Sequence, residues 1–500
     1  MTNTSKSHIN DVKKYIKKQW DVLTRDHQNL VETFVDTKIA CVDPKNKHII
    51  YIPHRENVRK ITAQLKKELS NKDFNTLNIK RLPAKISYCE QSSISRNPGL
   101  LYLPYPYISP GGRFNEMYGW DSYFIVLGLL YDNRLEMAKW MTDNIIYEVK
   151  YYGKILNANR SYFLTRSQPP FISSMILAIY KRTKDKQWLK STLRANSKAY
   201  EYWMTSPRLV KSTGLSRFYA ECDQPIPESE HGYYEAVRKF YRESDTKAYQ
   251  IEKYYHKKTD KLTAEFFRAD RTVREAGFDL TNKYGPFGAD ITNYLSVSLN
   301  SLLYKMEIDT VEIYCVLGDK KKMQLWQERS EKRAKLINQH LWEPDLGFYF
   351  DHNYHKDYNR TYIYATTFYP LWAGLANKEQ AARIVENLEV LEAKGGILSS
   401  AYVTGLQWDA PFGWAPHQFF AVRGLARYGY HKEAKRIARK FVNMLSKDFA
   451  RTKNLYEKYD MRRATSDVVT DIKYGYKINV EGFGWTNAVY LDFLHYLDGK

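Results

Sequence analysis

The sequence is that of a large basic protein: 500 residues, 43% of them hydrophobic and 15% aromatic, with a formal net charge of +21. The positive charges are dispersed, and no zinc-finger spacing, RNP-like strand or basic tail accompanies them, so we interpret them as a solvated surface and not as a nucleic-acid site. No apolar run is long enough to cross a bilayer and the N-terminus lacks a secretory signal, so we expect a soluble, cytoplasmic protein without a membrane partner.

In chain order, residues 1–45 predict a charged helical extension and residues 46–500 a single domain. Residues 48–53 (HIIYIP) predict a short strand that ends at the proline. From residue 124 onward, apolar residues recur at helical spacing in pairs of segments, as at 124–130 and 137–149, and again at 422–445. No linker or low-complexity stretch separates these pairs. We therefore predict one all-α domain of helical hairpins, in which strands are confined to short β-hairpins in the loops.

The cysteines and histidines give no sign of a metal or a disulfide. Cys41, Cys89, Cys222 and Cys315 lie far apart without a CxxC pair, which predicts free thiols in a reducing compartment. The 12 histidines show no HExxH or comparable ligand spacing. We expect no metal, no cofactor and a monomeric chain.

The segment 110–123, PGGRFNEMYGWDSY, concentrates chemistry in a short span. After the proline–glycine turn it offers a guanidinium, aromatic rings and two carboxylates. Charged hydrogen-bond partners orient hydroxyl groups and aromatic rings stack against C–H faces, so this mixture suits a sugar. The alternative is a loop whose aromatic residues pack into the core and whose charges face water.

Further loops of the same character lie between the predicted helices. They are residues 157–170 (NANRSYFLTRSQPP), 274–284 (REAGFDLTNKY), 407–418 (QWDAPFGWAPHQ), 457–460 (EKYD) and 481–487 (EGFGWTN). Each is weak evidence by itself, because a tryptophan in a loop more often packs than contacts a ligand. Five such loops in one helical chain favour a carbohydrate-binding cleft.

The segments PGGRFNEMYGWDSY and QWDAPFGWAP resemble the two signature motifs of the trehalases, family 37 of the glycoside hydrolases. The likeness runs from about residue 46 to residue 490, and KILNANRSYFLTRSQPPF, LNSLLYKMEID and EGFGWTNAVY are similar to the cytosolic neutral trehalases. The resemblance implies an (α/α)6 toroid. It also implies hydrolysis of α,α-trehalose to two glucose molecules with inversion at the attacked carbon.

The resemblance also implies roles for single residues. Asp279 matches the general acid of the family and Glu457 its general base. Arg113 and Arg166 match two of the three arginines that bind substrate in the family. The third has no counterpart in residues 224–229, where only Glu228 is carried over. The residues expected to bind substrate are Arg113, Tyr118, Trp120, Asp121, Asn157, Arg166, Gln168, Glu228, Ala276, Gly277, Trp414 and Glu481.

One loop departs from the family pattern, and it leaves alternatives open. EAGFDLTNK stands where neutral relatives read like ESGHDTTYR, so Ala276, Phe278 and Lys283 are substituted. A related α-glucosidase with another leaving group is therefore an alternative, as is a non-catalytic sugar-binding protein of the same fold. Inverting hydrolysis needs an acid and a base about 6.5–9.5 Å apart. We predict this separation for Asp279 and Glu457.

Overall fold

The structure is a computed structural model that describes residues 3–39, 48–86, 94, 97–244, 250–474 and 476–499. Among these residues, six helices form a closed ring, in which each helix contacts the next and the last contacts the first. In ring order they are α6 (Gly119–Tyr131), α8 (Ile172–Thr183), α12 (Val297–Leu317), α14 (Phe368–Ala373), α16 (Ala415–Arg427) and α18 (Gly484–Leu497).

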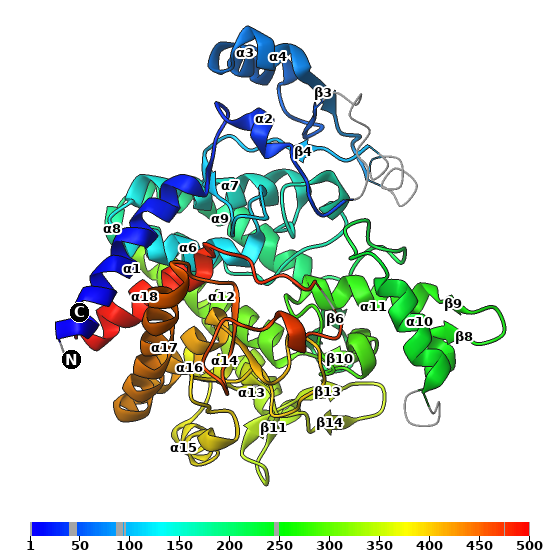
Figure 1. The fold of residues 1–500 in the computed structure, drawn as a ribbon, viewed down its shortest axis with the longest axis vertical. Helices are drawn as coiled ribbons and strands as arrows, with labels where there is room; N and C mark the ends of the chain where they lie inside the picture. The colour runs from blue at the N-terminus through cyan, green and yellow to red at the C-terminus, as the bar shows by residue number, and fades with distance from the viewer. Residues whose placement is uncertain are drawn as a thin grey trace.

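A second layer of helices covers this ring from outside (Figure 1). Five of them directly follow an inner helix in the chain, and α1 packs against α17 and α18. Together the two layers form the (α/α)6 toroid that the resemblance implies. The outer helices are α1 (Asn3–Val22), α7 (Leu135–Tyr152), α9 (Lys186–Trp203), α13 (Lys320–His340), α15 (Lys378–Glu386) and α17 (His431–Thr452).

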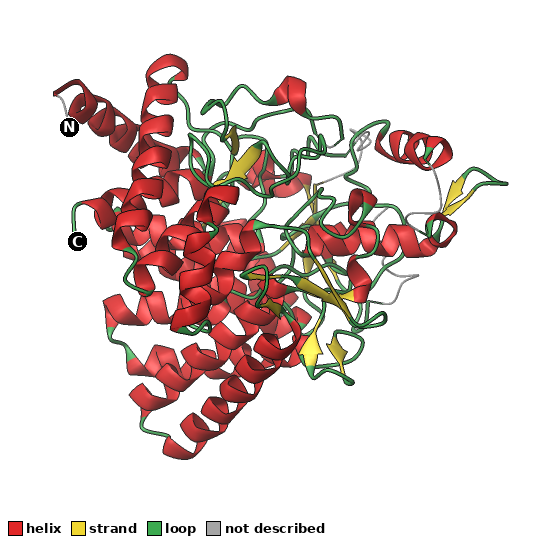
Figure 2. Ribbon diagram, turned by 90° about the horizontal axis from the view of Figure 1, so that it is seen from below, coloured by secondary structure: helices red, strands yellow, loops and turns green. Residues whose placement is uncertain are grey.

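The sequence explains which helices lie inside. Helices α6 and α18 are apolar on nearly every side, as expected of helices that are surrounded by protein. Helix α17 is amphipathic and buries one stripe, including Ile437, Phe441 and Leu445. Three inner helices, α6, α16 and α18, run in the same direction. Each begins at the end of the toroid where the long loops gather. Figure 2 shows most of the helices gathered on one side of the molecule and most of the strands and loops on the other.

The N-terminal helix α1 packs against the toroid. Val12, Ile16 and Trp20 of α1 are fully buried in the main hydrophobic core. The Trp20 ring packs beside Gly128 of α6, where a Cβ atom would lie 3.1 Å from the ring. The apolar face of α1 therefore completes the outer layer of the toroid.

A small parallel sheet follows α1 and α2 (Leu30–Thr33). The strand expected at 48–53 is present as β2 (His48–Ile52), and it lies between β3 (Leu77–Arg81) and β4 (Leu100–Leu101). Helices α3 (Val58–Glu68) and α4 (Asn71–Thr76) connect β2 to β3. The expectation of hairpins alone misses this sheet, because parallel pairing joins strands that are distant in sequence.

The other strands are short and antiparallel: five pairs and one three-stranded sheet, β10-β13-β14, among the described residues. Most important for the site is the pair of β15 (Phe412–Trp414) and β16 (Lys458–Asp460), in which Trp414 lies opposite Lys458. Two further helices, α10 (Tyr233–Glu243) and α11 (Ala264–Glu275), lie at the same end of the toroid. The remaining strands are β1 (Thr24–Arg25), β5 (Tyr107–Ile108), β6 (Leu209–Val210), β7 (Leu215–Ser216), β8 (Tyr255–His256), β9 (Lys261–Leu262), β10 (Tyr294–Leu295), β11 (Trp342–Glu343), β12 (Phe348–Tyr349), β13 (Asp351–Asn353) and β14 (Tyr358–Arg360).

Candidate active site

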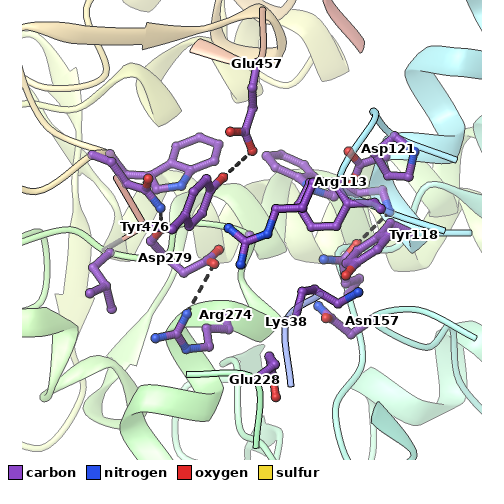
Figure 3. Close-up of a pocket in the computed structure, with 18 of the residues that line it drawn as sticks. Lys38, Arg113, Tyr118, Asp121, Asn157, Glu228, Arg274, Asp279, Glu457 and Tyr476 are labelled. Carbon is purple, nitrogen blue, oxygen red and sulfur yellow. Dashed lines mark hydrogen bonds and ion pairs between the residues drawn. The ribbon is translucent and has the colours of Figure 1, made fainter. Parts of the chain in front are cut away.

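A cavity opens where α6, α16 and α18 begin, and it collects residues from distant parts of the chain (Figure 3). All the residues predicted to form the site line this cavity, except Ala276 and Glu481. Those that line it are Arg113, Tyr118, Trp120, Asp121, Asn157, Arg166, Gln168, Glu228, Gly277, Trp414, Asp279 and Glu457.

The two exceptions have simple physical reasons. Ala276 ends α11 and its methyl group is fully buried in the core, behind the cavity wall. Glu481 lies on the surface, where it accepts a hydrogen bond of 3.0 Å from Asn454 Nδ2. From the same segment, Phe483 and Trp485 enter the cavity lining instead.

Backbone contacts join the signature loop to the loop that carries Asn157. The Gly119 amide donates to the Asn157 carbonyl at 3.2 Å, and the Trp120 amide donates to Gln168 Oε1 at 2.8 Å. The amide of Asn157 in turn donates to the Arg166 carbonyl at 3.0 Å. These bonds place both predicted arginine-bearing loops at one end of α6.

Several polar atoms around the cavity are buried without a hydrogen-bond partner among the described residues. They belong to Arg166 (Nε and one terminal nitrogen), Glu228 (Oε2), Arg274 (Nε) and Gln407 (Oε1). Arg166 also makes an ion pair with Glu228 and donates to Asn157 Oδ1 at 3.3 Å. An unpartnered buried polar group costs about 1–3 kcal/mol. A ligand rich in hydroxyl groups supplies the missing partners.

Asp279 is a carboxyl group surrounded by protein, with 33% of its side chain still accessible from the cavity. Burial raises its pKa from the ordinary 3.8 to about 6, against the lowering effect of Arg274 and Arg166, while Glu457 adds a smaller upward contribution. The Arg274 guanidinium lies 3.4 Å from Asp279 Oδ2. The backbone carbonyl of Asp279 accepts a hydrogen bond from the side-chain amide of Gln407, and this bond connects the loop to the second signature motif.

Glu457 has a different environment in the same cavity. Lys458 Nζ lies 3.0 Å from its Oε2, and the Tyr476 hydroxyl donates to its Oε1 (Figure 3). The Trp485 indole donates to the Glu457 carbonyl at 3.1 Å. The ammonium of Lys458 and the hydroxyl of Tyr476 thus hold one oxygen each of the Glu457 carboxyl group, which fixes its orientation in the cavity.

Tryptophan rings form a continuous part of the wall. Trp408 and Trp414 stack with centroids 4.0 Å apart and an interplanar angle of 2°. Trp120 lies 5.8 Å from Trp408 and 5.6 Å from Trp485. Such faces suit the C–H surface of a pyranose ring.

Comparisons with known proteins identify the family of this chain. The trehalase family model matches residues 2–498. The chain belongs to the trehalase family. The cytosolic neutral trehalase of Kluyveromyces lactis is 36% identical over 96% of this chain and 70% of its own length, and that of Saccharomyces cerevisiae is 36% identical over 98% and 72%.

Solved structures place the fold in the same family. The neutral trehalase of Saccharomyces cerevisiae matches with a TM-score of 0.83 and 35% identity, covering 98% of this chain and 94% of that one. A mannosylglycerate hydrolase from Thermus thermophilus matches at a TM-score of 0.54 and 18% identity, over 78% of this chain and 95% of that one. The second match indicates a shared fold only.

Sequence reasoning missed several residues of this trehalase-family cavity. Arg274 brings a further guanidinium from the segment that carries Asp279, and Glu230 accepts from Arg113 at 2.8 Å. Gln407 and Trp408 stand in the second signature motif together with Trp414, so the motif could have predicted them. Pro110, Phe114, Phe163, Arg274, Leu280, Phe483 and Trp485 also stand in the quoted motif segments, whereas no motif marked Lys38, Glu230, Tyr233 or Tyr476. The additional lining residues are Lys38, Pro110, Phe114, Phe163, Glu230, Tyr233, Arg274, Leu280, Gln407, Trp408, Tyr476, Phe483 and Trp485.

The substituted residues of the loop that carries Asp279 lie behind the cavity wall. Phe278 is 1% exposed and packs edge-on against Trp408, with ring centroids 5.5 Å apart. The Lys283 ammonium is buried against Asp351 at 2.9 Å and Thr366 at 2.7 Å. Neither residue lines the cavity, so the departure from the family pattern changes the support of the site and not its described surface.

Other expectations concern metals, membranes and thiols. The described residues contain no group of histidine, cysteine or acidic side chains that could hold a metal ion. None of the helices in the described ranges is both long and apolar enough to span a bilayer. Cys222 and Cys315 are free, whereas Cys41 and Cys89 lie outside the described residues.

Proposed function

We propose that the protein is a cytosolic α,α-trehalase that hydrolyses trehalose to two glucose molecules with inversion at the attacked anomeric carbon. The observation that carries this proposal is the pair Asp279 and Glu457 in the cavity of a trehalase-family chain. The relatives named cytosolic neutral trehalases support the substrate and the compartment.

Asp279 acts as the general acid. The departing glucose needs a proton on the glycosidic oxygen, because an alkoxide is a poor leaving group. Burial raises the pKa of Asp279 to about 6, so a useful fraction of the enzyme carries this proton near neutral pH. Arg274, which opposes the rise, lies beside the carboxylate that remains after transfer and stabilises it.

Glu457 acts as the general base. It removes a proton from a water molecule as that water attacks the anomeric carbon from the face opposite the leaving group. The ammonium of Lys458 and the hydroxyl of Tyr476 hold its carboxylate in place. Their contacts fix one orientation of the base, which keeps it aligned with the attacked carbon.

The other cavity residues bind the two sugar rings. The unpartnered N–H groups of Arg166 and Arg274 donate to sugar hydroxyl groups, and the unpartnered oxygen of Glu228 accepts from one. Asp121 is 4% exposed, and burial, followed by the charge of Glu457, raises its pKa well above the usual range. It therefore offers a protonated carboxyl that can donate to a sugar hydroxyl as well as accept.

An NMR time course with the purified protein and trehalose tests the proposal. Inversion of one α-linkage releases one β-glucose from the attacked ring and one α-glucose from the leaving ring, before mutarotation mixes them. Two α-glucose molecules at early times would contradict inversion. A parallel set of other α-glucosides tests specificity: faster turnover of one of them than of trehalose would favour the α-glucosidase alternative, and no glucose from any would favour a binding protein.

A further inference from the structure

Residues 33–39, from the last residue of α2 to the undescribed part of the N-terminal region, bring one side chain, that of Lys38, to the cavity. Lys38 is in the cavity lining, although it precedes the first signature motif by more than 70 residues. Its side chain is 5% exposed. Figure 3 shows Lys38 close to Asn157 and Tyr118, with Glu457 well separated from it in the view.

The Lys38 ammonium is held by two carboxylates. Its Nζ lies 2.9 Å from Asp36 Oδ1 and 2.8 Å from Glu116 Oε2. An ammonium has three N–H donors, so these two contacts leave one donor for a ligand. Lys38 also lies over the ring of Phe114, 5.7 Å from its centroid, and Phe114 is itself part of the cavity lining.

The segment is anchored firmly enough to position this ammonium. Arg160 donates to the Thr33 carbonyl at 2.9 Å and to Glu116 Oε1 at 2.6 Å. The Tyr162 hydroxyl donates to Asp36 Oδ2 at 2.8 Å. The anchor thus joins the N-terminal segment to the signature loop through Glu116 and to the following loop through Arg160.

The electrostatics of this cluster are balanced. Burial by itself would raise the pKa values of Asp36 and Glu116, but Lys38 and Arg160 outweigh it and lower both. Two cations therefore face two carboxylates, with no charge in excess. A cation that is already neutralised keeps its donor strength while adding no net charge to the cavity, which suits a neutral ligand.

We propose that Lys38 is a substrate-binding residue, whose third N–H donates to one hydroxyl group of the sugar. The inference rests on the proposed function, since it assumes that the cavity binds trehalose. It makes the N-terminal segment part of the active site: α1 and α2 deliver residues 33–39 to the cavity, and the signature loop closes around Lys38. A domain boundary at residue 45 would separate this substrate-binding residue from the rest of the site.

A methionine substitution with a matched control tests the inference. Lys38→Met keeps the length of the side chain and removes the ammonium. Lys154→Met is the control, because Lys154 is 4% exposed, lies 2.7 Å from Glu221 and is outside the cavity lining. We expect kcat/KM for trehalose to fall by about 10- to 100-fold in Lys38→Met, as for loss of a hydrogen bond from a charged donor, with little change in Lys154→Met. Equal losses in the two variants would overturn the inference.

Monodeoxy trehaloses separate binding from a purely structural role. If Lys38 donates to one hydroxyl, removing that hydroxyl from the substrate should abolish the difference between wild type and Lys38→Met, while the other analogues should preserve it. A difference of the same size on every analogue would mean that Lys38 only supports the wall.

A second variant tests the inference even if Lys38→Met does not fold. Lys38→Arg keeps a cation between Asp36 and Glu116 but moves the remaining donor, so we expect a folded protein with a raised KM and the same dependence on one analogue. Wild-type kinetics on all analogues would overturn the inference. The proposed function fails separately: a wild-type protein that releases no glucose refutes the function, whereas an active one with Lys38→Met equal to Lys154→Met refutes only the role of Lys38.

Discussion

The Nζ atom of Lys458 lies 3.0 Å from Oε2 of Glu457, the residue just before it, and the two side chains are 0% and 3% exposed. The same ammonium donates to the Ile478 carbonyl at 2.9 Å. Burial lowers the pKa of Lys458, and the neighbouring Glu457 opposes that effect. A buried charge that loses its partner is destabilising, so each member of this pair depends on the other.

Replacement of Glu457 by Gln removes the proposed base and keeps its shape. We expect kcat to fall by about 10²–10⁴, because general acid–base catalysis typically contributes that much. Lys458→Met should lower kcat less, because the carboxylate of Glu457 loses one of the two side-chain contacts that orient it and keeps the hydrogen bond from Tyr476. A near wild-type rate in Glu457→Gln would show that the base is misassigned.

The raised pKa of Asp279 leads us to predict how kcat/KM for trehalose changes on the alkaline side of its pH profile. Catalysis needs its protonated form, so kcat/KM for trehalose should fall as pH rises through a pKa of about 6. Asp279→Asn should lower kcat for trehalose by about 10² or more. With α-glucosyl fluoride, whose leaving group departs without protonation, the variant should retain activity and lack this limb. Equal losses on both substrates would contradict the role of acid.

The same carboxyl group predicts an effect on stability. Its pKa is raised in the folded state, so the folded protein binds more protons than the unfolded chain between pH 3.8 and about 6, and stability falls as pH rises through this window. Asp279→Asn removes that cost. The melting temperature of the variant should therefore exceed that of wild type at pH 8, with a smaller difference at pH 4. A constant difference at both pH values would mean that the change acts through packing.

The sequence predicted the toroid well for reasons that are local. Apolar residues at helical spacing mark pairs such as α16 and α17, and the specific motifs connect them to a known architecture. The parallel sheet of β2 with β3 and β4 was beyond such reasoning, because its pairing joins residues 48–52 to 77–81 and 100–101. The place of α1 was missed for a related reason: its apolar stripe is visible in sequence, but its partners on α17 and α18 lie at the other end of the chain.

The site follows the same division. Residues inside the motifs were found, including Asp279 and Glu457, because motif positions carry over one by one. Tyr476 and Lys38 were not, since each reaches the cavity through a long-range contact that no short pattern encodes: the Tyr476 hydroxyl on Glu457, and the Lys38 ammonium on Glu116. The separation expected for the carboxyl groups of Asp279 and Glu457 stays a prediction.

Gly277 gives a prediction that separates backbone strain from the geometry of the site. Its φ is +82°, and a Cβ atom there would lie 3.0 Å from two carbons of the Trp120 ring. Gly318, at the end of α12, has nearly the same φ of +78° but nothing within 4 Å of its Cβ position. Alanine at a left-handed position costs about 1–2 kcal/mol, so both Gly277→Ala and Gly318→Ala should lower the melting temperature.

Only Gly277→Ala should also affect catalysis, because its methyl group displaces Trp120 and shifts the loop that ends at Asp279. A displacement of about 1 Å at a reacting group can cost about 10²-fold in rate. We therefore expect kcat for trehalose to fall strongly in Gly277→Ala and to stay near the wild-type value in Gly318→Ala, measured at a temperature where both are folded. Similar kcat values in the two variants would show that the cavity tolerates the added methyl group, and that Gly277 is required only for its backbone conformation.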